Sequence, residues 1–180
     1  MPPDTVSTID KRARFERAML PHLGAAYNLA RWLTGSEQQA EDVVQDSFVR
    51  ALTFFDGFHG EDGRAWLLAI VRNSCYDWMK QNRRQEEIRG PAEDVELAAD
   101  GGPDPEAQQL CLADRRMVRE SLEKLPAEYR EVLILRESEG MSYKQIAQVV
   151  RAPIGMVMSR LARARKRLQR VLAASAGKES

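Results

Sequence analysis

The segment from Gly140 to Leu168 constrains the fold of this 180-residue chain most, because it predicts two short helices joined by a tight turn. Ser142 and Gln145 form a capping-box pattern at the start of the first helix, and a turn around Pro153 separates it from the second. We expect the second helix over about residues 154–172. Its apolar residues recur in steps of three and four, which predicts one buried stripe of Ile154, Val157, Leu161, Ala164, Leu168 and Val171.

The same segment is strongly basic. Residues 141–171 contain eight basic side chains and no acidic one, although the whole chain balances 27 basic against 27 acidic residues. A solvated basic face on a surface helix is the simpler alternative, but a helix-turn-helix with uncompensated charge indicates binding to duplex DNA. The start of the second helix would meet base edges, and its later arginines would meet phosphates. The positions predicted to meet bases are Gly155, Met156, Met158, Ser159 and Arg160.

An acidic stretch divides the chain into two parts. Residues 86–114 contain nine acidic side chains, one basic side chain and several Gly and Pro residues, a composition typical of a flexible linker. Strand signals are almost absent elsewhere, and helical periodicity dominates. We therefore predict an all-α chain of two small helical domains, over residues 10–85 and 115–175, joined by this flexible acidic linker.

The first domain should contain three main helices. The first is expected over residues 11–33, with a break or kink at Pro21, and the others over residues 37–55 and 64–83. In the second domain, helices are expected over residues 106–125 and 127–138, before the helix-turn-helix.

A polar patch lies on the second predicted helix. Glu41, Asp42, Gln45 and Asp46 are spaced so that they share one face of that helix. From the residues alone, a solvated helix face is the favoured interpretation.

The loop at residues 56–63 and the helix after it combine aromatic and cationic side chains. This mixture suits an unpaired nucleic-acid strand, whose bases stack on aromatic rings while cations bind phosphates. Trp66 is expected in the core, whereas Tyr76 and Trp78 could serve either purpose.

Together these segments resemble the extracytoplasmic-function sigma factors, a two-domain branch of the sigma-70 family. The resemblance covers about residues 12–172 and rests on residues 40–51, residues 66–73 with Asp77, and residues 125–167. It implies a factor that binds core RNA polymerase, recognises −10 and −35 promoter elements and helps to open the promoter. The partners that it implies are the β′ clamp and β flap of the polymerase, promoter DNA and an anti-sigma factor.

The resemblance also implies a role for each candidate residue. The surface that docks on the polymerase clamp would comprise Glu41, Asp42, Gln45, Asp46 and Phe48. Contacts to the −10 element would come from Phe58, His59, Asp62, Arg64, Arg72, Asn73, Lys80, Arg83 and Arg84. Contacts to the −35 element would come from Ser142, Tyr143, Gly155, Met156, Met158, Ser159, Arg160, Arg163, Lys166 and Arg167.

The chain departs from the family pattern around its helix-turn-helix. Val150 and Arg151 stand where a Leu-Gly-like pair is common, and Ala152 stands where glycine is common. Met156 and Met158 replace a threonine and a lysine of the usual Gly-Thr-Val-Lys-Ser-Arg opening. Because methionine offers no strong hydrogen bond to a base or phosphate, we expect an unusual −35 preference or a weaker dependence on that element.

Other functional classes have little support in the sequence. We expect no catalytic constellation, metal site, cofactor, membrane insertion or secretory signal, and the two distant cysteines, Cys75 and Cys111, indicate a reducing, cytoplasmic compartment. An autonomous helix-turn-helix repressor or activator is the main alternative, and a nucleic-acid-processing enzyme is a more distant one. Because each domain is small, an anti-sigma factor that clamps both domains is an attractive partner.

Overall fold

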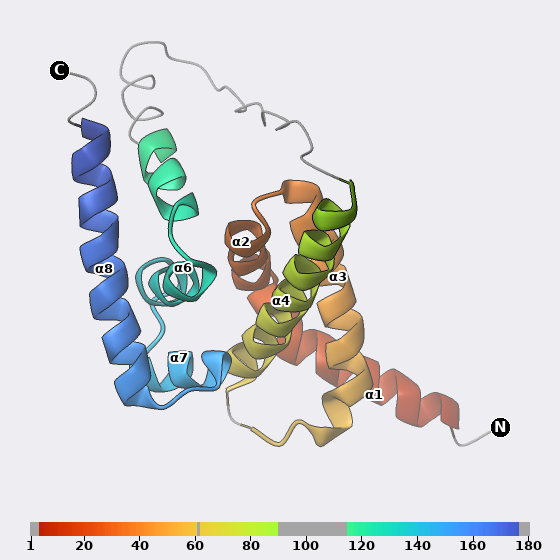
Figure 1. Cartoon of the computed structure of the whole chain (residues 1–180). Helices are drawn as coiled ribbons and strands as arrows, with labels where there is room; N and C mark the ends of the chain where they lie inside the picture. Colours follow the sequence, from red (N-terminus) through yellow and green to blue (C-terminus); the bar gives the residue numbers. More distant parts are fainter. Residues whose placement is uncertain (1–3, 61, 90–114, 177–180) are drawn as a thin grey trace, which may run out of the picture.

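The computed structural model describes residues 4–60, 62–89 and 115–176, and every regular element in these ranges is helical. Two halves stand side by side in Figure 1. The first contains α1 to α4, and the second contains a helix over residues 115–123 followed by α6, α7 and α8. The all-α prediction is confirmed. Residues 90–114, with most of the predicted linker and Cys111, lie outside the described ranges.

The first predicted helix is divided at proline, as expected. α1 spans Asp4–Met19, the 3-10 turn η1 spans Leu20–His22, and α2 spans Leu23–Thr34. Pro21 has no backbone N–H to donate and its ring crowds the preceding turn, which accounts for the break. Gly35 ends α2 in the left-handed conformation, at φ 74°, and its N–H bonds to the carbonyl of Arg31 at 3.1 Å.

The remaining helices of the first half pack around α2. α3 spans Glu37–Phe54 and begins at Ser36, whose hydroxyl accepts a hydrogen bond from the Gln39 N–H at 3.5 Å. After the short turn η2, Phe55–Gly57, α4 spans Gly63–Arg89. It continues six residues past the predicted end at Arg83, so the first residues of the predicted linker are helical. The core includes Phe15, Met19, Leu29, Val43, Leu67, Val71 and Cys75.

The second half confirms the helix-turn-helix. α6 spans Ala127–Leu133 and continues as a π-helical turn, η3, over Ile134–Ser138. α7 spans Tyr143–Val150 behind a complete capping box of Ser142 and Gln145, and α8 spans Ile154–Ala176. Within α8, Val157, Leu161 and Ala164 are buried as predicted. Ile154 is 45% exposed, so its prediction as a core residue is wrong: at the first position of α8 its side chain is not covered by a neighbouring helix.

Arg151 occupies a backbone position that favours glycine. It follows α7 with φ 52° and ψ 49°, the left-handed conformation, in which a Cβ atom crowds the following carbonyl. Replacing Arg151 with glycine should therefore raise the free energy of unfolding by about 0.5–1 kcal/mol, after the greater freedom of glycine in the unfolded chain is taken into account. Urea denaturation measures the change.

A glycine inside the neighbouring helix provides the control for that experiment. Gln148 is exposed within α7, and Gln148→Gly should lower the free energy of unfolding by about 1 kcal/mol. Equal losses in the two variants would show that the left-handed position of Arg151 carries no strain.

The two halves contact each other directly. α4 packs against α7, and α2 packs against α6, so an interdomain interface runs along the middle of Figure 1. None of the helices in the described ranges combines the length and apolar character that a membrane span requires.

Candidate nucleic-acid interface

The polar patch on α3 faces solvent. Glu41, Asp42, Gln45 and Asp46 are all exposed, and none of them forms a hydrogen bond or ion pair through its side chain with another described residue. Four adjacent unpaired polar groups, three of them carboxylates, leave their hydrogen-bonding capacity available to a partner.

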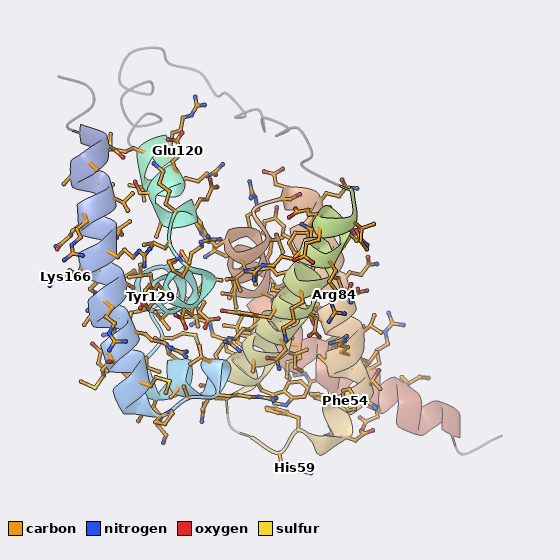
Figure 2. The ribbon with its side chains drawn as sticks, in the orientation of Figure 1. Phe54, His59, Arg84, Glu120, Tyr129 and Lys166 are labelled. Carbon is orange, nitrogen blue, oxygen red and sulfur yellow. The ribbon has the colours of Figure 1, made fainter. Side chains whose placement is uncertain are left out.

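Phe48, which was grouped with this patch, points toward the core. Its ring meets the edge of Phe15 at 6.1 Å between centroids and is only half-buried. Sequence reasoning missed Val49 and Phe54, which are 62% and 66% exposed on the same helix. Figure 2 shows Phe54 at the lower end of α3. The spacing of Val49 four residues after Gln45 could have placed it beside the polar patch.

The loop before α4 combines an aromatic cluster with an exposed imidazole. Phe58 stacks on Phe55 at 5.9 Å between centroids and lies 4.9 Å from the ring of Trp66. Trp66 is partly buried against the core, which agrees with its predicted position. His59 is exposed at the tip of the loop, at the bottom of Figure 2.

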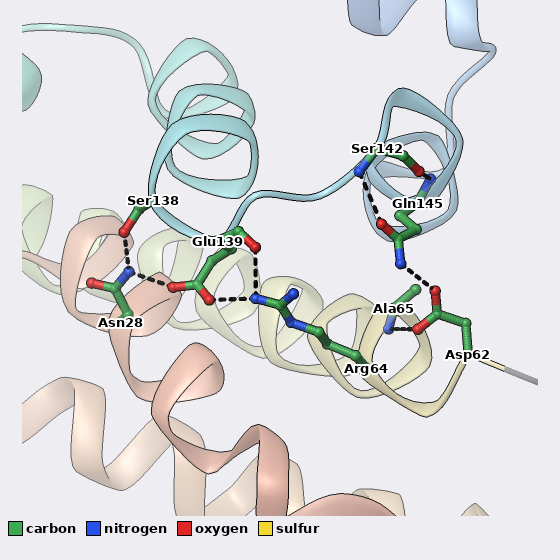
Figure 3. Close-up of polar contacts among 8 residues, drawn as sticks. All are labelled: Asn28, Asp62, Arg64, Ala65, Ser138, Glu139, Ser142 and Gln145. Carbon is green, nitrogen blue, oxygen red and sulfur yellow. Dashed lines mark hydrogen bonds and ion pairs between the residues drawn. The ribbon is translucent and has the colours of Figure 1, made fainter.

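Asp62 caps the helix that follows this loop. Its carboxylate accepts the Ala65 N–H at 2.9 Å and, through its second oxygen, the side-chain amide of Gln145 at 2.8 Å (Figure 3). Partial burial opposes ionisation, but these two hydrogen bonds, together with the nearby charges of His22 and Arg64, lower the pKa of Asp62. The carboxylate therefore stays charged at neutral pH.

Arg64 reaches across to the second half of the chain. Its guanidinium donates to the Glu139 carboxylate at 2.6 Å and to the Glu139 backbone carbonyl at 2.9 Å. Asn28 of α2 donates to the same carboxylate at 2.6 Å and to the Ser138 hydroxyl at 2.9 Å (Figure 3). Arg64, which was predicted to contact the −10 element, therefore forms part of the interdomain interface.

Arg72 is engaged in the same way. It donates to both oxygens of Glu131, at 2.6 and 3.0 Å, and its guanidinium lies 4.4 Å from the ring centroid of Tyr76. Glu131 is fully buried, and burial raises the pKa of its carboxyl while the two hydrogen bonds and the charge of Arg72 lower it. Asn73, next along α4, is half-buried.

The far part of α4 carries exposed cations. Lys80, Arg83 and Arg84 are exposed, and none of their side chains forms an ion pair within the described part of the chain. Arg84 lies on the upper part of α4 in Figure 2, far along the helix from the loop that contains His59. The structure therefore does not bring these three cations together with Phe58 and His59.

α7 and the start of α8 present the residues predicted to read duplex DNA. Ser142 is exposed while its backbone N–H and hydroxyl complete the capping box, and Tyr143 lies 4.8 Å beneath the guanidinium of Arg136. Gly155, Met156, Met158 and Ser159 are exposed at the start of α8. Arg160 is half-buried and lies 3.8 Å from Glu128 of α6, so it is partly turned away from this face.

The later turns of α8 form a continuous basic face. Arg163, Lys166, Arg167 and Arg170 are exposed and, with Tyr129, line a shallow depression of about 590 Å³. Figure 2 shows Lys166 on the side of α8 away from the first half of the chain. Arg165, by contrast, is bonded to Glu137 at 2.6 Å. Four cations that have no acidic partner within the described ranges suit the phosphates of a nucleic acid.

The described residues contain no group of three or more His, Cys, Asp or Glu side chains placed to hold a metal ion. The polar side chains that meet at the interdomain interface form ion pairs and amide hydrogen bonds between helices.

Comparison with known proteins assigns this architecture to a family. Residues 19–85 match the model for sigma-70 region 2, and residues 115–168 match the model for sigma-70 region 4. The RNA polymerase sigma-H factor of Pseudomonas aeruginosa is 32% identical over 170 residues, which cover 91% of this chain and 88% of the relative. The chain belongs to the sigma-70 family.

Two further comparisons define the branch. The ECF RNA polymerase sigma-E factor of Haemophilus influenzae is 33% identical over 146 residues, covering 74% of this chain and 75% of the relative. The solved sigma factor RpoE of Bartonella quintana, in complex with the anti-sigma factor NepR, is 30% identical with a TM-score of 0.70, covering 89% of this chain and 97% of that chain. This protein is therefore an extracytoplasmic-function sigma factor, which directs core RNA polymerase to promoters.

The family assignment divides the surfaces of this sigma factor between two regions. The polar patch of α3, the loop around His59 and the cations of α4 lie in the part that matches region 2. The helix-turn-helix and the basic face up to Leu168 lie in the part that matches region 4. The interface with Arg64 and Arg72 joins these two regions.

Proposed function

We propose that this sigma factor works through three separate surfaces, carried by domains at residues 10–85 and 115–175. They are the polar patch of α3, the loop before α4 together with the cations of α4, and the helix-turn-helix with the basic face of α8. The observation that best supports the proposal is the basic face of α8, whose four cations lack acidic partners among the described residues, although the whole chain balances 27 basic against 27 acidic side chains. Such a face supplies affinity for a phosphate backbone but no sequence information. Specificity and promoter opening must then come from the other surfaces.

The polar patch of α3 is proposed to dock on the β′ clamp of core RNA polymerase. Its carboxylates are exposed and form no ion pair with another described residue, so docking breaks no ion pair of theirs in that part of the chain. Val49 and Phe54 extend the surface with apolar area, which gives the contact a hydrophobic part. Region 4 is proposed to contact the β flap.

The loop from Phe58 to Arg64 is proposed to capture an unstacked base of the −10 element. Its aromatic rings can stack on a base, and Arg64, Arg72 and Asn73 stand on the first turns of the adjoining helix. Lys80, Arg83 and Arg84 would hold the phosphates of the neighbouring duplex.

The start of α8 is proposed to read the −35 element, with Met156 and Met158 setting an unusual preference. Both methionines are exposed at the groove-facing end of the helix, at 45% and 52%. Met156→Thr with Met158→Lys should strengthen binding to a duplex with a generic −35 sequence about tenfold, because the lysine adds a phosphate contact and the threonine a hydrogen-bonding group.

Fluorescence anisotropy with a panel of −35 duplexes tests this prediction. The wild-type chain should rank the sequences differently from the double variant and bind the generic sequence less tightly. The same ranking and the same affinities in both proteins would exclude a specificity role for the two methionines.

An anti-sigma factor is proposed as the regulatory partner, acting on the protein in the cytoplasm. The support is the likeness to RpoE, which was solved with NepR and matches this chain over 89% of its length. Both domains are small and contact each other through α4 with α7 and α2 with α6, so a partner that binds both regions could fix their relative position.

Assembly of a complex with core RNA polymerase distinguishes a sigma factor from an autonomous helix-turn-helix repressor. The chain should co-elute with core RNA polymerase, and a promoter duplex should be retained tightly only when both proteins are present. Tight binding to a palindromic duplex without polymerase, and no co-elution with it, would instead support the repressor.

A further inference from the structure

The start of α8 exposes three large apolar side chains within five residues. Ile154, Met156 and Met158 are 45%, 45% and 52% exposed. Val118 is the one other large apolar side chain that is exposed in the described part of the second half. Exposed apolar side chains that gather at one place mark a surface that a partner covers.

Helical geometry places these side chains on two flanks of one strip. Ile154 and Met158 are four residues apart, so they lie next to each other on one flank, and Met156 is turned to the other flank. Gly155 and Ser159 lie between the flanks, and a Cβ atom added at Gly155 would meet no atom within 4 Å. The small residues in the middle let the helix approach a surface closely, while the longer side chains reach that surface on both sides.

Hydrogen-bonding groups are scarce at this end of the helix. Ser159 has the only polar side chain among residues 154–159. Arg160 is half-buried and lies 3.8 Å from Glu128, so its guanidinium is partly directed toward α6. Arg163, the first cation of the exposed basic face, follows Met156 by about two turns. Recognition of bases at the start of α8 must therefore rely mainly on apolar contacts.

The major groove of duplex DNA offers one apolar group to such side chains. Thymine presents its C5-methyl group at the groove edge, and 5-methylcytosine presents the same group at the same place, whereas cytosine has only a hydrogen there. Methionine is unbranched and polarisable, so it adapts to small apolar partners. The cations farther along α8 suit the phosphates of the same duplex, which makes DNA the occupant that fits the charge of this surface.

We propose that Ile154, Met156 and Met158 read pyrimidine C5-methyl groups in the −35 element. This inference rests on the proposed function of α8 and specifies how that helix selects a sequence. It predicts −35 elements with thymines on both strands, one strand for each flank. It also predicts that methylation of a cytosine at a contacted position strengthens binding, because burial of one methyl group corresponds to about a fourfold change in affinity.

Promoter fragments that differ by single methyl groups test the proposal. The full chain is assembled with core RNA polymerase, and its preferred −35 sequence is selected from a promoter pool that is randomised at this element. Deoxyuridine, which differs from thymine only in lacking the C5-methyl group, then replaces each −35 thymine in turn. Affinity, measured by competition, should fall about fourfold at each contacted position. The same replacement in the spacer between the two elements should leave the affinity unchanged.

The reverse change adds a methyl group to another base. A promoter with cytosine at a contacted position is compared with one that has 5-methylcytosine there. The methylated promoter should bind about fourfold more tightly, because its methyl group occupies the place of the thymine methyl. Both comparisons use the wild-type chain, so neither depends on the folding of a variant.

Variants of the three side chains then assign each methyl contact to a flank. Met156→Gln and Met158→Gln keep the length and the helix propensity of methionine but replace its thioether with a polar amide. Each should abolish the methyl effect at a different position, and Ile154→Thr should reduce it at the position that Met158 contacts. Val118→Thr is the control, because Val118 lies in the helix over residues 115–123, at the opposite end of the second half from the start of α8 in Figure 1.

The outcomes distinguish this inference from the proposed function. Equal affinity for thymine and deoxyuridine at every −35 position, or methyl effects that persist in all three variants, would overturn methyl recognition and leave the reading of the −35 element by α8 standing. A polymerase complex without any preference among −35 sequences would overturn the proposed function of α8 and this inference with it.

Discussion

Replacing both Asp42 and Asp46 with arginine should weaken binding to core RNA polymerase by about a hundredfold or more, because like charges brought together at an interface cost several kcal/mol. Both carboxylates are exposed on α3, and neither supports the fold through an ion pair within the described residues. The variant should therefore keep the helical content and thermal stability of the wild type. Titration of labelled protein with core polymerase in the absence of DNA gives the affinity.

The control for this prediction reverses two charges elsewhere. Glu86 and Glu87 are exposed near the end of α4, on a different helix from the patch, and Glu86→Arg with Glu87→Arg changes the net charge by the same amount. This control should bind polymerase within about twofold of the wild type, as expected for charges outside the contact. Equal losses in both double variants would show that net charge, and not the α3 patch, governs the affinity.

Removing three cations from α8 should have the second large effect. Arg163, Lys166 and Arg167 are exposed and have no acidic partner among the described residues, so each is free to neutralise a phosphate. The triple alanine variant should bind a −35 duplex on the order of a hundredfold more weakly and should lower the slope of log affinity against log salt by about three. The loss should be similar for every duplex sequence, since phosphate contacts carry no base information.

Arg165 supplies the comparison on the same helix. It is already bonded to Glu137 at 2.6 Å, so Arg165→Ala should change the salt dependence by well under one unit of slope. A triple variant with an unchanged salt slope, or one whose loss depends strongly on sequence, would show that these cations do not bind phosphates.

Most of the fold could be predicted from local signals in the sequence. Pro21 breaks the first helix because it lacks a backbone donor, and the Ser142–Gln145 pattern starts α7 because its two groups satisfy each other's backbone N–H. The exposure of Ile154 could not be predicted from periodicity, because the pattern defines a helix face but not where the neighbouring helices end. The residues of this chain alone do not predict the left-handed conformation of Arg151. Glycine, which adopts that conformation easily, is common at this position in the family.

The interdomain contacts were the least predictable part of the site. Arg64 and Arg72 were assigned to DNA by resemblance, and nothing local in the sequence pairs them with Glu139 and Glu131, which lie 75 and 59 residues away. Such pairs depend on how two helical domains meet, which is a property of packing and not of helical periodicity. The polar patch of α3 was easier to predict, because spacing alone places its four residues on one helix face, although its proposed role comes from the resemblance.

Run-off transcription with purified core polymerase, with and without this chain, on a library of promoters tests the central claim most directly. The account predicts initiation that depends on the chain and is confined to promoters with particular −10 and −35 elements. In the same assay, the Asp42→Arg/Asp46→Arg variant should be inactive on every promoter. Transcripts that are identical with and without the chain, together with tight binding of the chain to duplex DNA in the absence of polymerase, would contradict it.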